Sequence, residues 1–580
     1  MLEIRNLALP LDFGLEGGEG IARAAIARVL GVKPSALGSV RLMRRSVDAR
    51  KKAHVRFVGT FAVDVPDAVE RRVLARPSKG PARISAYEEP TPYRVADVSG
   101  ADIPRPIVVG FGPAGMFAAL VLAQAGMRPI VLERGDDAHA RTKAVRAFEE
   151  GGALDAESNV QFGEGGAGTF SDGKLTTNIK DPRCRTVLEA FAAAGAPEEI
   201  LWKAKPHIGT DLLPDIVANL RFRIESLGGE VRFRARMTKL PMRDGAVCGV
   251  GVRDGRTGEE CTIPARDVIV ACGHSARDTF RMIHGRGFVF ERKPFAMGVR
   301  IEHPQKLVDS IQYGPAAGHP ALDAADYKLA VHLPSGRGVY TFCMCPGGQV
   351  VCAESEEGGV CVNGMSRFAR DGANANAALL VEVKPGDLSG DDVFAGIELQ
   401  RRVEAAAYRA GGGDYRAPAQ TLGDFLEGKG AAGPSRTVVP TYARGVAWCD
   451  LHDVLPGFIV DAIREAMPLL DAKMRGFGDP DAVLTAVEAR SSSPVRIVRD
   501  RATLQARLRD TQGASGCAVG VAADRAESEA AGASSVGHIE VGRTGLFPAG
   551  EGAGYAGGIM SAAVDGMRAA EAVIAQYAEG

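Results

Sequence analysis

The sequence predicts an α/β protein in which a parallel, doubly wound sheet is preceded by a small α+β domain and interrupted by a mixed α/β insertion. Three observations predict this fold class. An N-terminal stretch reads as strand, helix, strand, strand, helix, strand. The next part of the chain has a strand, a glycine-rich turn, a helix and a second strand, and one more strand and helix return near the C-terminal end. The predicted domains are residues 1–95, 96–295, 296–480 and 481–580.

The first domain has helical stretches near Glu19–Val32 and Asp67–Leu74, between short apolar runs with strand periodicity. This element order is that of a ferredoxin-like α+β unit. A connector with Pro, Gly and Asp follows near Ser99–Pro106. A small-residue stretch at 522–535 is predicted to be an exposed loop or a poorly ordered segment.

Composition indicates a globular protein with several domains. The chain has 580 residues, 46% of them hydrophobic, and a formal net charge of -1, so it carries no overall bias toward nucleic acid or anionic membrane. The N-terminal residues lack a basic segment followed by an apolar one, and the ten cysteines are scattered without a CxxC pair. We therefore expect a cytoplasmic, reduced protein with no metal site and no membrane span.

A glycine motif follows the first strand of the predicted parallel sheet. With 72 glycines in the chain, GxGxxG should occur by chance on the order of once, and it also fits two other places. Only the match at Gly110, Gly112 and Gly115 follows a buried strand, opens an apolar helix and precedes an acid, Glu133, at the end of a second strand. This context predicts a Rossmann-type dinucleotide site, the alternative being a glycine-rich turn that binds nothing.

Each of these residues has a physical reason to be there. Gly110 permits the tight turn, Gly112 lets the backbone approach a diphosphate, and Gly115 allows close packing of helix on strand. The helix N-terminus offers unpaired N–H groups and the positive end of a dipole. We expect Glu133 to accept hydrogen bonds from the ribose hydroxyls of the adenosine, and these features alone leave NAD and FAD open.

The C-terminal stretch Gly545–Val573 favours FAD. It is predicted to form a strand, a glycine-rich crossing and a long helix, which a simple NAD domain does not need. In a flavoprotein, the amides near Gly557–Ile559 would stabilise negative charge on the flavin pyrimidine ring, and Glu551 would lie near the ribityl chain or the phosphates. The alternative is ordinary helix packing made close by small residues.

Eight long sequence blocks are compositionally unusual. They are SVDARKK at Ser46, GFGPAGMFAAL at Gly110, ESNVQFGEGGAGTFSDGKLTT at Glu157, GHSARDTF at Gly273, KPFAMGVRIEHPQ at Lys293, GVYTFCMCPGG at Gly338, ARSSSPVRI at Ala489 and PAGEGAGYAGGIMSAAVDG at Pro548. With these blocks the chain resembles a known family, the uncharacterised FAD-dependent dehydrogenases of bacteria and plants, which are distantly similar to glutathione-reductase-like flavoproteins. The resemblance covers nearly the whole chain and departs at Ser491, where threonine is expected. It implies an FAD domain of that type and an N-terminal accessory domain, but no substrate.

The glycine-rich segment Gly163–Gly173 is expected to lie along the flavin, where Thr169 and Ser171 can form hydrogen bonds. Its GxxxxGK match is not a phosphate loop, because Leu175 replaces the required Ser or Thr. The predicted cofactor contacts are Gly110, Gly112, Pro113, Ala114, Gly115, Glu133, Arg134, Gly165, Gly166, Thr169, Ser171, Gly273, Gly550, Glu551, Gly557, Gly558 and Ile559.

Four residues are candidates for substrate binding. Arg300 and His303 lie in one block, the histidine as an acid/base or an anion contact, although a structural histidine is the commoner case. Arg490 and Arg496 are candidates for holding a carboxylate or phosphate, with a salt-bridged surface strand as the alternative. His274 is expected to pack against the cofactor.

Cys343 and Cys345 form a CxC pair, which next to a flavin would suit a disulfide relay. Two cysteines on one strand point to one face, but packing or chance is the favoured interpretation.

The leading hypothesis is an FAD-dependent oxidoreductase that passes a hydride between a small-molecule substrate and flavin N5. A second strand–GxGxxG–helix–acid unit is not found, so NAD(P)H is expected only as a transient visitor. One alternative is an RNA-modifying flavoenzyme, although nucleic acid is not the expected partner. Another is a non-enzymatic flavin-binding protein. The RNA alternative depends on basic residues of the first domain: Arg41, Arg44, Arg45, Arg50, Lys51, Lys52 and Arg56.

Overall fold

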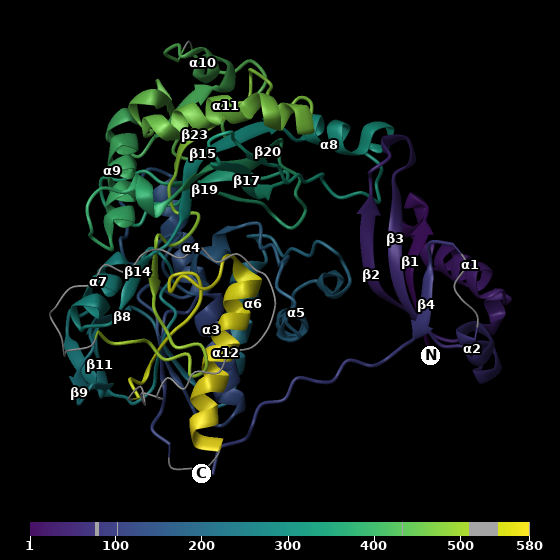
Figure 1. The fold of residues 1–580 in the computed structure, drawn as a ribbon, viewed down its shortest axis with the longest axis horizontal. Coiled ribbons are helices and arrows are strands. Elements are labelled where there is room, and N and C mark those ends of the chain that lie inside the picture. The colour runs from purple at the N-terminus through teal and green to yellow at the C-terminus, as the bar shows by residue number, and fades with distance from the viewer. Residues whose placement is uncertain (76–79, 101–102, 432, 510–542, 579–580) are drawn as a thin grey trace, which may run out of the picture.

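The computed structural model describes residues 1–75, 80–100, 103–431, 433–509 and 543–578. The segment 522–535, predicted as an exposed loop, lies outside the described residues. Figure 1 shows three bodies: an N-terminal unit in purple, a lower body that contains the C-terminal helix, and an upper body in teal and green. No described helix combines the length and apolar character needed to cross a bilayer.

The N-terminal unit is an antiparallel sheet of order β2-β3-β1-β4 that packs against two helices. Buried apolar residues alternate along β1, and the buried positions change from even, at Leu2 and Ile4, to odd, at Leu7 and Leu9. A register shift lies between Ile4 and Leu7, where Asn6 has a φ of 57°. The elements are β1 (Leu2–Leu9), α1 (Gly18–Leu30), β2 (Val40–Asp48), β3 (Arg56–Val63), α2 (Asp67–Leu74) and β4 (Arg83–Ala86).

The lower body contains a five-stranded sheet of order β25-β13-β5-β6-β7, parallel throughout. Val108 and Ile269 pack with the helices of one face, whereas Ile107 and Val268 pack with a three-stranded sheet, β12-β11-β8, on the other. This burial on both faces explains the unbroken apolar runs that predicted these strands. The central elements are β5 (Ile107–Val109), α3 (Pro113–Gln124), β6 (Ile130–Leu132), β7 (Glu230–Arg232), β13 (Val268–Val270), β25 (Leu546–Pro548) and α12 (Ile559–Ala578).

Shorter elements complete this body. Helices α3, α5, α6 and α12 share one apolar cluster on the helical face of the parallel sheet. The elements are α4 (Ala138–Glu149), α5 (Arg183–Ala193), α6 (Leu213–Ser226), β8 (Ala235–Lys239), β9 (Met242–Arg243), β10 (Ala246–Val247), β11 (Gly249–Asp254), β12 (Glu260–Pro264) and α7 (Arg277–Gly285).

The upper body is a seven-stranded mixed sheet of order β16-β17-β20-β15-β23-β21-β22. Helices α9 and α11 pack on it in one large apolar cluster. Its elements are β15 (Phe295–Pro304), α8 (Gln305–Tyr313), β16 (Ala330–His332), β17 (Gly338–Cys345), β18 (Gln349–Cys352), β19 (Val362–Met365), β20 (Asn374–Val383), α9 (Ala395–Ala410), β21 (Ala417–Thr421), α10 (Leu422–Glu427), β22 (Val446–Trp448), α11 (Gly457–Lys473) and β23 (Val483–Glu488).

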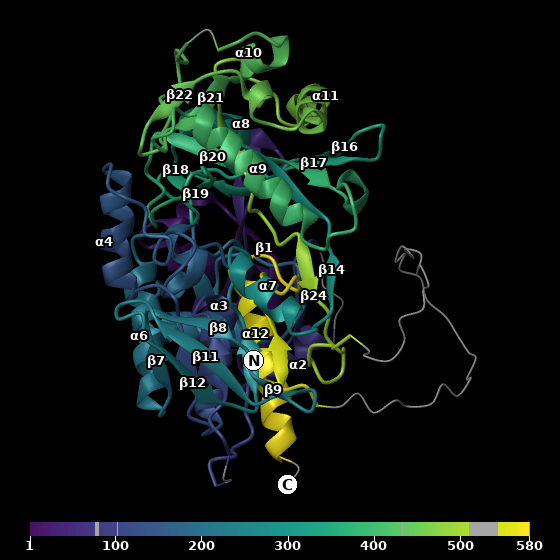
Figure 2. The same ribbon diagram turned by 90° about the vertical axis from the view of Figure 1, so that its left-hand side faces the viewer.

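The predicted boundary at residue 480 is too early, because β23 pairs with β15 and β21 inside this upper sheet. Every residue of β23 is buried, so its sequence pattern equals that of a strand in the parallel sheet. Two short strands, β14 (Phe290–Arg292) and β24 (Val495–Ile497), pair where the chain passes between the two bodies. Figure 2 shows them between the upper and lower sheets.

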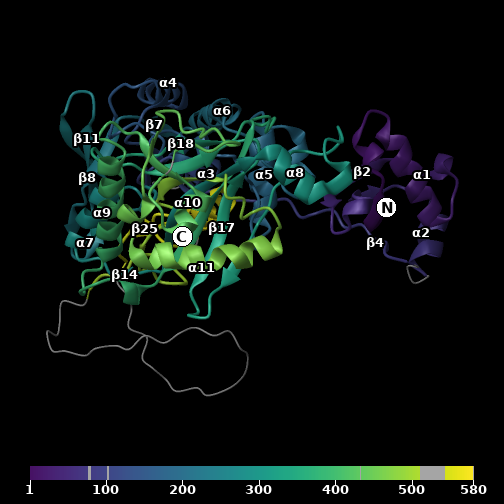
Figure 3. The same ribbon diagram turned by 90° about the horizontal axis from the view of Figure 1, so that it is seen from above.

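The N-terminal unit docks through residues of its predicted basic cluster. The guanidinium of Arg45 lies between the rings of Phe57 and Trp202, 4.7 Å from each centroid. Its backbone N–H donates to the Trp202 carbonyl at 2.7 Å. Lys52 Nζ donates to the Gln312 carbonyl at 2.5 Å, at the end of α8, and Figure 3 shows this unit next to α8. Part of the basic cluster is therefore used inside the molecule.

A buried carboxyl of the upper body predicts a pH dependence of stability. Glu354 is 1% exposed, its Oε1 accepts a hydrogen bond from the Tyr442 hydroxyl at 2.6 Å, and its Oε2 has no hydrogen-bond partner among the described residues. Burial raises the pKa of Glu354 from 4.5 to about 7, although the Tyr442 hydrogen bond lowers it. Its stabilising contribution is therefore complete below pH 4.5, where both states are protonated, and is lost as the pH rises through 7.

Glu354→Gln is expected to remove this dependence. Between about pH 5.5 and about pH 8, wild type should lose about 2 kcal/mol more unfolding free energy than the variant. Urea unfolding of both proteins at the two pH values, followed by the fluorescence of Trp448 in a Trp202→Phe background, measures the difference. Equal pH dependence in the two proteins would show that Glu354 is already ionised in the folded state.

Candidate cofactor site

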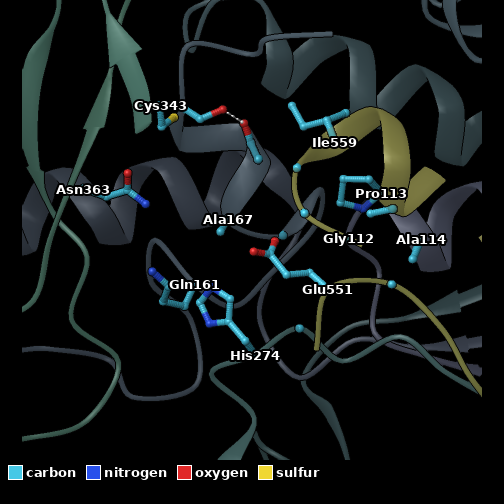
Figure 4. A pocket seen from close by; sticks show the side chains of 18 of the residues that line it. Gly112, Pro113, Ala114, Gln161, Ala167, His274, Cys343, Asn363, Glu551 and Ile559 are labelled. Atoms are coloured by element: carbon cyan, nitrogen blue, oxygen red, sulfur yellow. Dashed lines mark hydrogen bonds between the residues drawn. The ribbon is translucent and has the colours of Figure 1, made fainter. Parts of the chain in front are cut away.

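A cavity of about 560 Å³ lies between the parallel sheet and the upper sheet. Its floor is formed where β5, β6, β13 and β25 end, the edge at which open α/β sheets bind ligands. Its roof includes Thr341–Met344 of β17 and Asn363 of β19. The volume is in the range of about 300–1,000 Å³ that small-molecule and cofactor sites occupy. Figure 4 shows side chains from both bodies around it.

The first glycine turn has the geometry that the motif requires. Gly110 has a φ of +95°, and a Cβ there would lie 2.5 Å from the Ala271 carbonyl oxygen. A Cβ on Gly115 would lie 1.9 Å from the Gly110 carbonyl oxygen. Helix α3 starts at Pro113 after Gly112, without a side-chain cap, and Gly112–Ala114 line the cavity. The helix therefore presents its N-terminal N–H groups where a diphosphate can bind.

Glu133 holds three segments of the site together. Its carboxylate accepts hydrogen bonds from the backbone N–H groups of Phe111 at 2.8 Å, Gly135 at 2.9 Å and Gly163 at 2.9 Å. The side chain is 4% exposed and lines the cavity. A carboxylate has about four acceptor positions, and three of them are occupied here. About one position is left for a ribose hydroxyl, and this contact stays a prediction.

The segment Gly163–Gly173 packs against the first turn backbone to backbone. Gly165 N–H donates to the Phe111 carbonyl at 2.9 Å, and a Cβ on Gly166 would lie 2.9 Å from the Gly112 Cα. Thr169 turns away from the cavity, because its hydroxyl donates to the Glu164 carbonyl at 3.1 Å. Gly165 and Thr169 thus shape this segment and do not line the cavity.

The C-terminal segment closes the same cavity. A Cβ on Gly550 would lie 2.7 Å from the Ala114 Cβ, and a Cβ on Gly566 of α12 would lie 2.0 Å from the Ala114 carbonyl oxygen. At the start of α12, a Cβ on Gly168 would contact Ile559 at 3.3 Å. The turn after β5 and the glycines after β25 are therefore neighbours, although more than four hundred residues separate them in sequence.

Most of the predicted cofactor residues line this one cavity. Gly115 lies behind it and packs the helix on the strand, as predicted from the motif. Those that line it are Gly110, Gly112, Pro113, Ala114, Glu133, Arg134, Gly166, Ser171, Gly273, Gly550, Glu551, Gly557, Gly558 and Ile559.

Two titratable side chains point into the middle of the cavity in Figure 4, Glu551 and His274. Burial raises the pKa of Glu551 to about 7, against the opposing effects of the Lys293 ammonium and of the Gly558 N–H. Burial lowers the pKa of His274, and the charges of Arg490 and Arg277 lower it further. His274 is therefore a neutral ring at physiological pH, consistent with packing against a cofactor.

Arg300 and His303 do not have the substrate contacts predicted for them. Arg300 is fully buried and donates from Nε to Glu488 at 2.7 Å. His303 is buried, and its Nε2 lies 2.8 Å from the Phe477 carbonyl oxygen. Neither lines the cavity, because both belong to β15 in the middle of the upper sheet, a strand that is buried on both of its faces.

Arg490 and Arg496 are also paired within the protein. Arg490 lines the cavity, but its Nε and Nη2 each donate to Glu404 at 2.7 Å. Arg277 donates to the same carboxylate, and together they lower the pKa of Glu404 to about 2. Arg496 forms a surface ion pair with Glu291 at 2.8 Å and does not line the cavity.

Sequence reasoning missed a polar group on the upper side of the cavity. Asp172 is fully buried and accepts hydrogen bonds from Arg370 Nε at 2.9 Å and Nη2 at 2.6 Å. Lys174 Nζ lies 4.0 Å from the same carboxylate. Asp172 and Lys174 lie in the sequence block that starts at Glu157, which is part of the family resemblance. Arg370 is distant from them in sequence, so only the fold brings it to the site.

These features define a Rossmann-type FAD-binding protein. One end of the cavity has an uncapped helix start for a diphosphate, its floor is glycine backbone, and the start of α12 lies at the other end. The residues present fit an extended dinucleotide with a ring system at the α12 end.

Comparison with known proteins agrees with this class. Residues 105–157 match an FAD binding domain, residues 294–491 match the family described as "FAD-dependent protein, C-terminal domain-like", and residues 1–64 match a domain of unknown function. A Clostridium beijerinckii protein described as "Uncharacterized protein" is 42% identical over 578 residues, which are 99% of each chain. The chain belongs to the family of that protein, a family of FAD-dependent proteins, and FAD is its cofactor.

Solved structures show only distant likeness. Glycerol-3-phosphate dehydrogenase from Bacillus halodurans, complexed with FAD, is 14% identical with a TM-score of 0.26, and the match covers 52% of each chain. A flavoprotein/dehydrogenase from Cytophaga hutchinsonii is 14% identical with a TM-score of 0.27, and the match covers 50% of this chain and 58% of that one. The chain thus spans little more than half the length of these proteins.

Proposed function

We propose that the protein is an FAD-dependent oxidoreductase that transfers a hydride between a small-molecule substrate and the flavin. The observation that carries this proposal is the extent of the cavity. It continues beyond the predicted cofactor residues to Tyr327, Thr341 and Asn363 of the upper body. This part provides a lined space for a substrate beside the α12 end, where the flavin ring is expected.

FAD supplies hydride chemistry at its N5 atom when it is bound. The protein contributes charge at the α12 end, because the positive end of the helix dipole favours negative charge on a neighbouring ring. On the substrate side, both oxygens of Asp172 are used by Arg370, so the ammonium of Lys174 is left in excess. We therefore expect a substrate that carries an anionic group, with nicotinamide as a transient visitor at most.

The proposal predicts that one class of donor bleaches the bound flavin and that an acceptor restores it over many turnovers. The measurement is the visible spectrum of the FAD-loaded protein, recorded anaerobically with NADH, NADPH, organic acids and alcohols. Lys174→Met should raise the KM for an anionic donor about tenfold or more and leave the FAD content unchanged, because Lys174 lies on the substrate side. A flavin that stays oxidised with every donor would instead favour a flavin-binding protein without enzymatic activity.

The RNA-modifying alternative is weakened because five of the seven residues of the basic cluster are used within the protein. Besides Arg45 and Lys52, Arg50 and Arg56 both bind Asp48, and Arg41 donates to the Tyr87 hydroxyl at 2.6 Å. Charges that are paired within the protein are less available to phosphates.

A further inference from the structure

Two cysteines of β17 occupy different environments at the cavity wall. Cys343 is half-buried and lines the cavity, whereas Cys345 is fully buried behind it. Figure 4 shows the Cys343 side chain on the same wall of the cavity as Asn363. The charge of Cys343 acts on Glu551, whose carboxylate accepts a hydrogen bond from the Gly558 N–H just before α12. Cys343 therefore lies on the side of the cavity where the flavin ring is expected.

The backbone at this pair is irregular. The register of β17 against β20 shifts between Phe342 and Cys345, and Cys343 has a φ of 41°, which is uncommon for a residue with a side chain. In a regular strand, residues two apart are separated by about 6.6 Å, near the upper limit for a disulfide. Here the Cys345 thiol turns back and donates to the Cys343 carbonyl at 3.2 Å. The register shift thus turns the Cys345 thiol toward Cys343, within reach of a side-chain hydrogen bond between the two residues.

Arg300 of β15 stabilises this conformation of the backbone. Its Nη1 donates to the Cys343 carbonyl at 2.9 Å, while its Nε and Nη2 bind Glu488 and Asn363. Arg300 is thus a positioning residue for Cys343 rather than a substrate contact.

The charges around the pair favour one thiolate and one thiol. A hydrogen bond from Cys345 lowers the pKa of Cys343 to about 5, with help from the charges of Lys174 and Arg300. The pKa of Cys345 is raised by the same hydrogen bond and by burial. An accessible thiolate next to a buried thiol is the combination that thiol–disulfide redox pairs use.

The other described cysteine at the cavity wall differs in this respect. Cys272 lines the cavity near Arg134, but burial raises its pKa to about 12. Cys343 thus differs from Cys272 in having a lowered pKa and in having a second cysteine, Cys345, two residues away.

We infer that Cys343 and Cys345 form a redox-active dithiol that exchanges two electrons with the bound flavin, and that the substrate class is a dithiol or disulfide. In the oxidative direction, the Cys343 thiolate and the Cys345 thiol form an Sγ–Sγ bond, the S–H bond of Cys345 breaks, and its proton and two electrons convert oxidised FAD to the reduced anion. In the reverse direction the reduced flavin anion returns two electrons and one proton to the disulfide, the Sγ–Sγ bond breaks, and the Cys343 thiolate and the Cys345 thiol are restored. This pair then reduces a substrate disulfide by exchange: the Cys343 thiolate attacks one substrate sulfur and the other leaves, Cys345 displaces the second, and the Cys343–Cys345 disulfide and a substrate dithiol result. This inference rests on the proposed oxidoreductase function and names its substrate class.

The first test counts electrons. FAD-loaded wild type, oxidised with diamide and titrated anaerobically with dithionite, should consume two electrons more per flavin than Cys345→Ser treated in the same way. Cys449→Ser, which removes a half-buried thiol outside the cavity, should behave as wild type. Equal consumption by wild type and Cys345→Ser would overturn the inference.

The second test needs neither activity nor a variant. In the apoprotein, iodoacetamide at about pH 6.5 should modify Cys343 about tenfold or more faster than Cys449, whose pKa is raised by burial. After diamide treatment, the peptide with both cysteines should contain an internal disulfide by mass spectrometry. Slow modification of Cys343, or two free thiols after diamide, would overturn the inference.

Failure of this inference can be distinguished from failure of the proposed function. If Cys343→Ser loaded with FAD still turns over with a donor that is not a thiol, the oxidoreductase proposal stands and the dithiol inference fails. If wild-type flavin is bleached by a dithiol but by no hydride donor, and the disulfide adds two electrons to the titration, the dithiol inference stands and the proposed hydride transfer fails.

Discussion

Replacing Gly112 by alanine is expected to weaken FAD binding by about 100-fold or more while leaving the fold intact. Gly112 has φ −75° and ψ −174°, which any residue adopts. An added Cβ would meet its nearest protein atom, the Gly166 Cα, at 3.6 Å, an ordinary contact. The methyl group would instead occupy the space through which the backbone approaches the diphosphate. Titration of the apoprotein with FAD, followed by flavin fluorescence, measures the affinity.

Two other glycines provide the controls. Gly386→Ala should bind FAD normally, because a Cβ there has no neighbour within 4 Å. Gly115→Ala should destabilise the protein by several kcal/mol, about the cost of a severe core overpacking, because its Cβ would lie 1.9 Å from the Gly110 carbonyl oxygen. Normal FAD affinity in Gly112→Ala would show that the diphosphate does not lie against this turn.

Arg300→Met is expected to destabilise the protein by about 3–5 kcal/mol, the cost of leaving one partner of a buried ion pair alone. Arg300 is fully buried and Glu488 is 2% exposed, so water cannot compensate the remaining carboxylate. The variant also removes the donor to the Cys343 carbonyl and to Asn376. Urea unfolding of wild type and variant measures the loss.

The double variant Arg300→Met/Glu488→Leu tests the physical reason. Removing both charges should recover much of the lost stability, because no unpaired charge remains in the core. Iodoacetamide should nevertheless modify Cys343 more slowly in the double variant than in wild type, because the hydrogen bond from Arg300 to the Cys343 carbonyl is missing. An Arg300→Met variant as stable as wild type would contradict the account of the buried ion pair, and unchanged modification of Cys343 in the double variant would contradict the positioning role of Arg300.

Local patterns predicted the elements that line the candidate cofactor site. The strand before Gly110, the helix after it and the acid at position 133 are contiguous, so short-range periodicity and turn chemistry are sufficient. The strand and helix at β25 and α12 were predicted for the same reason. That these two stretches share one cavity followed from the chemistry of the flavin rather than from any local pattern.

Predictions that depended on long-range partners were wrong or incomplete. Arg300 and Arg490 have the charge of substrate contacts, but Glu488 and Glu404 neutralise them, and these partners are not adjacent in the chain. Similarly, Thr169 was predicted to contact the flavin, but its hydroxyl is used by the turn of its own segment. At Cys343 and Cys345, the sequence shows a strand pattern and does not reveal the register shift between Phe342 and Cys345.

The crystal structure of the FAD-loaded protein tests the two-part site most directly. We predict the diphosphate at the N-terminus of α3, beside Gly110 and Gly112, and the isoalloxazine between the start of α12 and the β17 wall near Cys343. An isoalloxazine found away from Ile559 and β17, or FAD bound outside this cavity, would contradict the account.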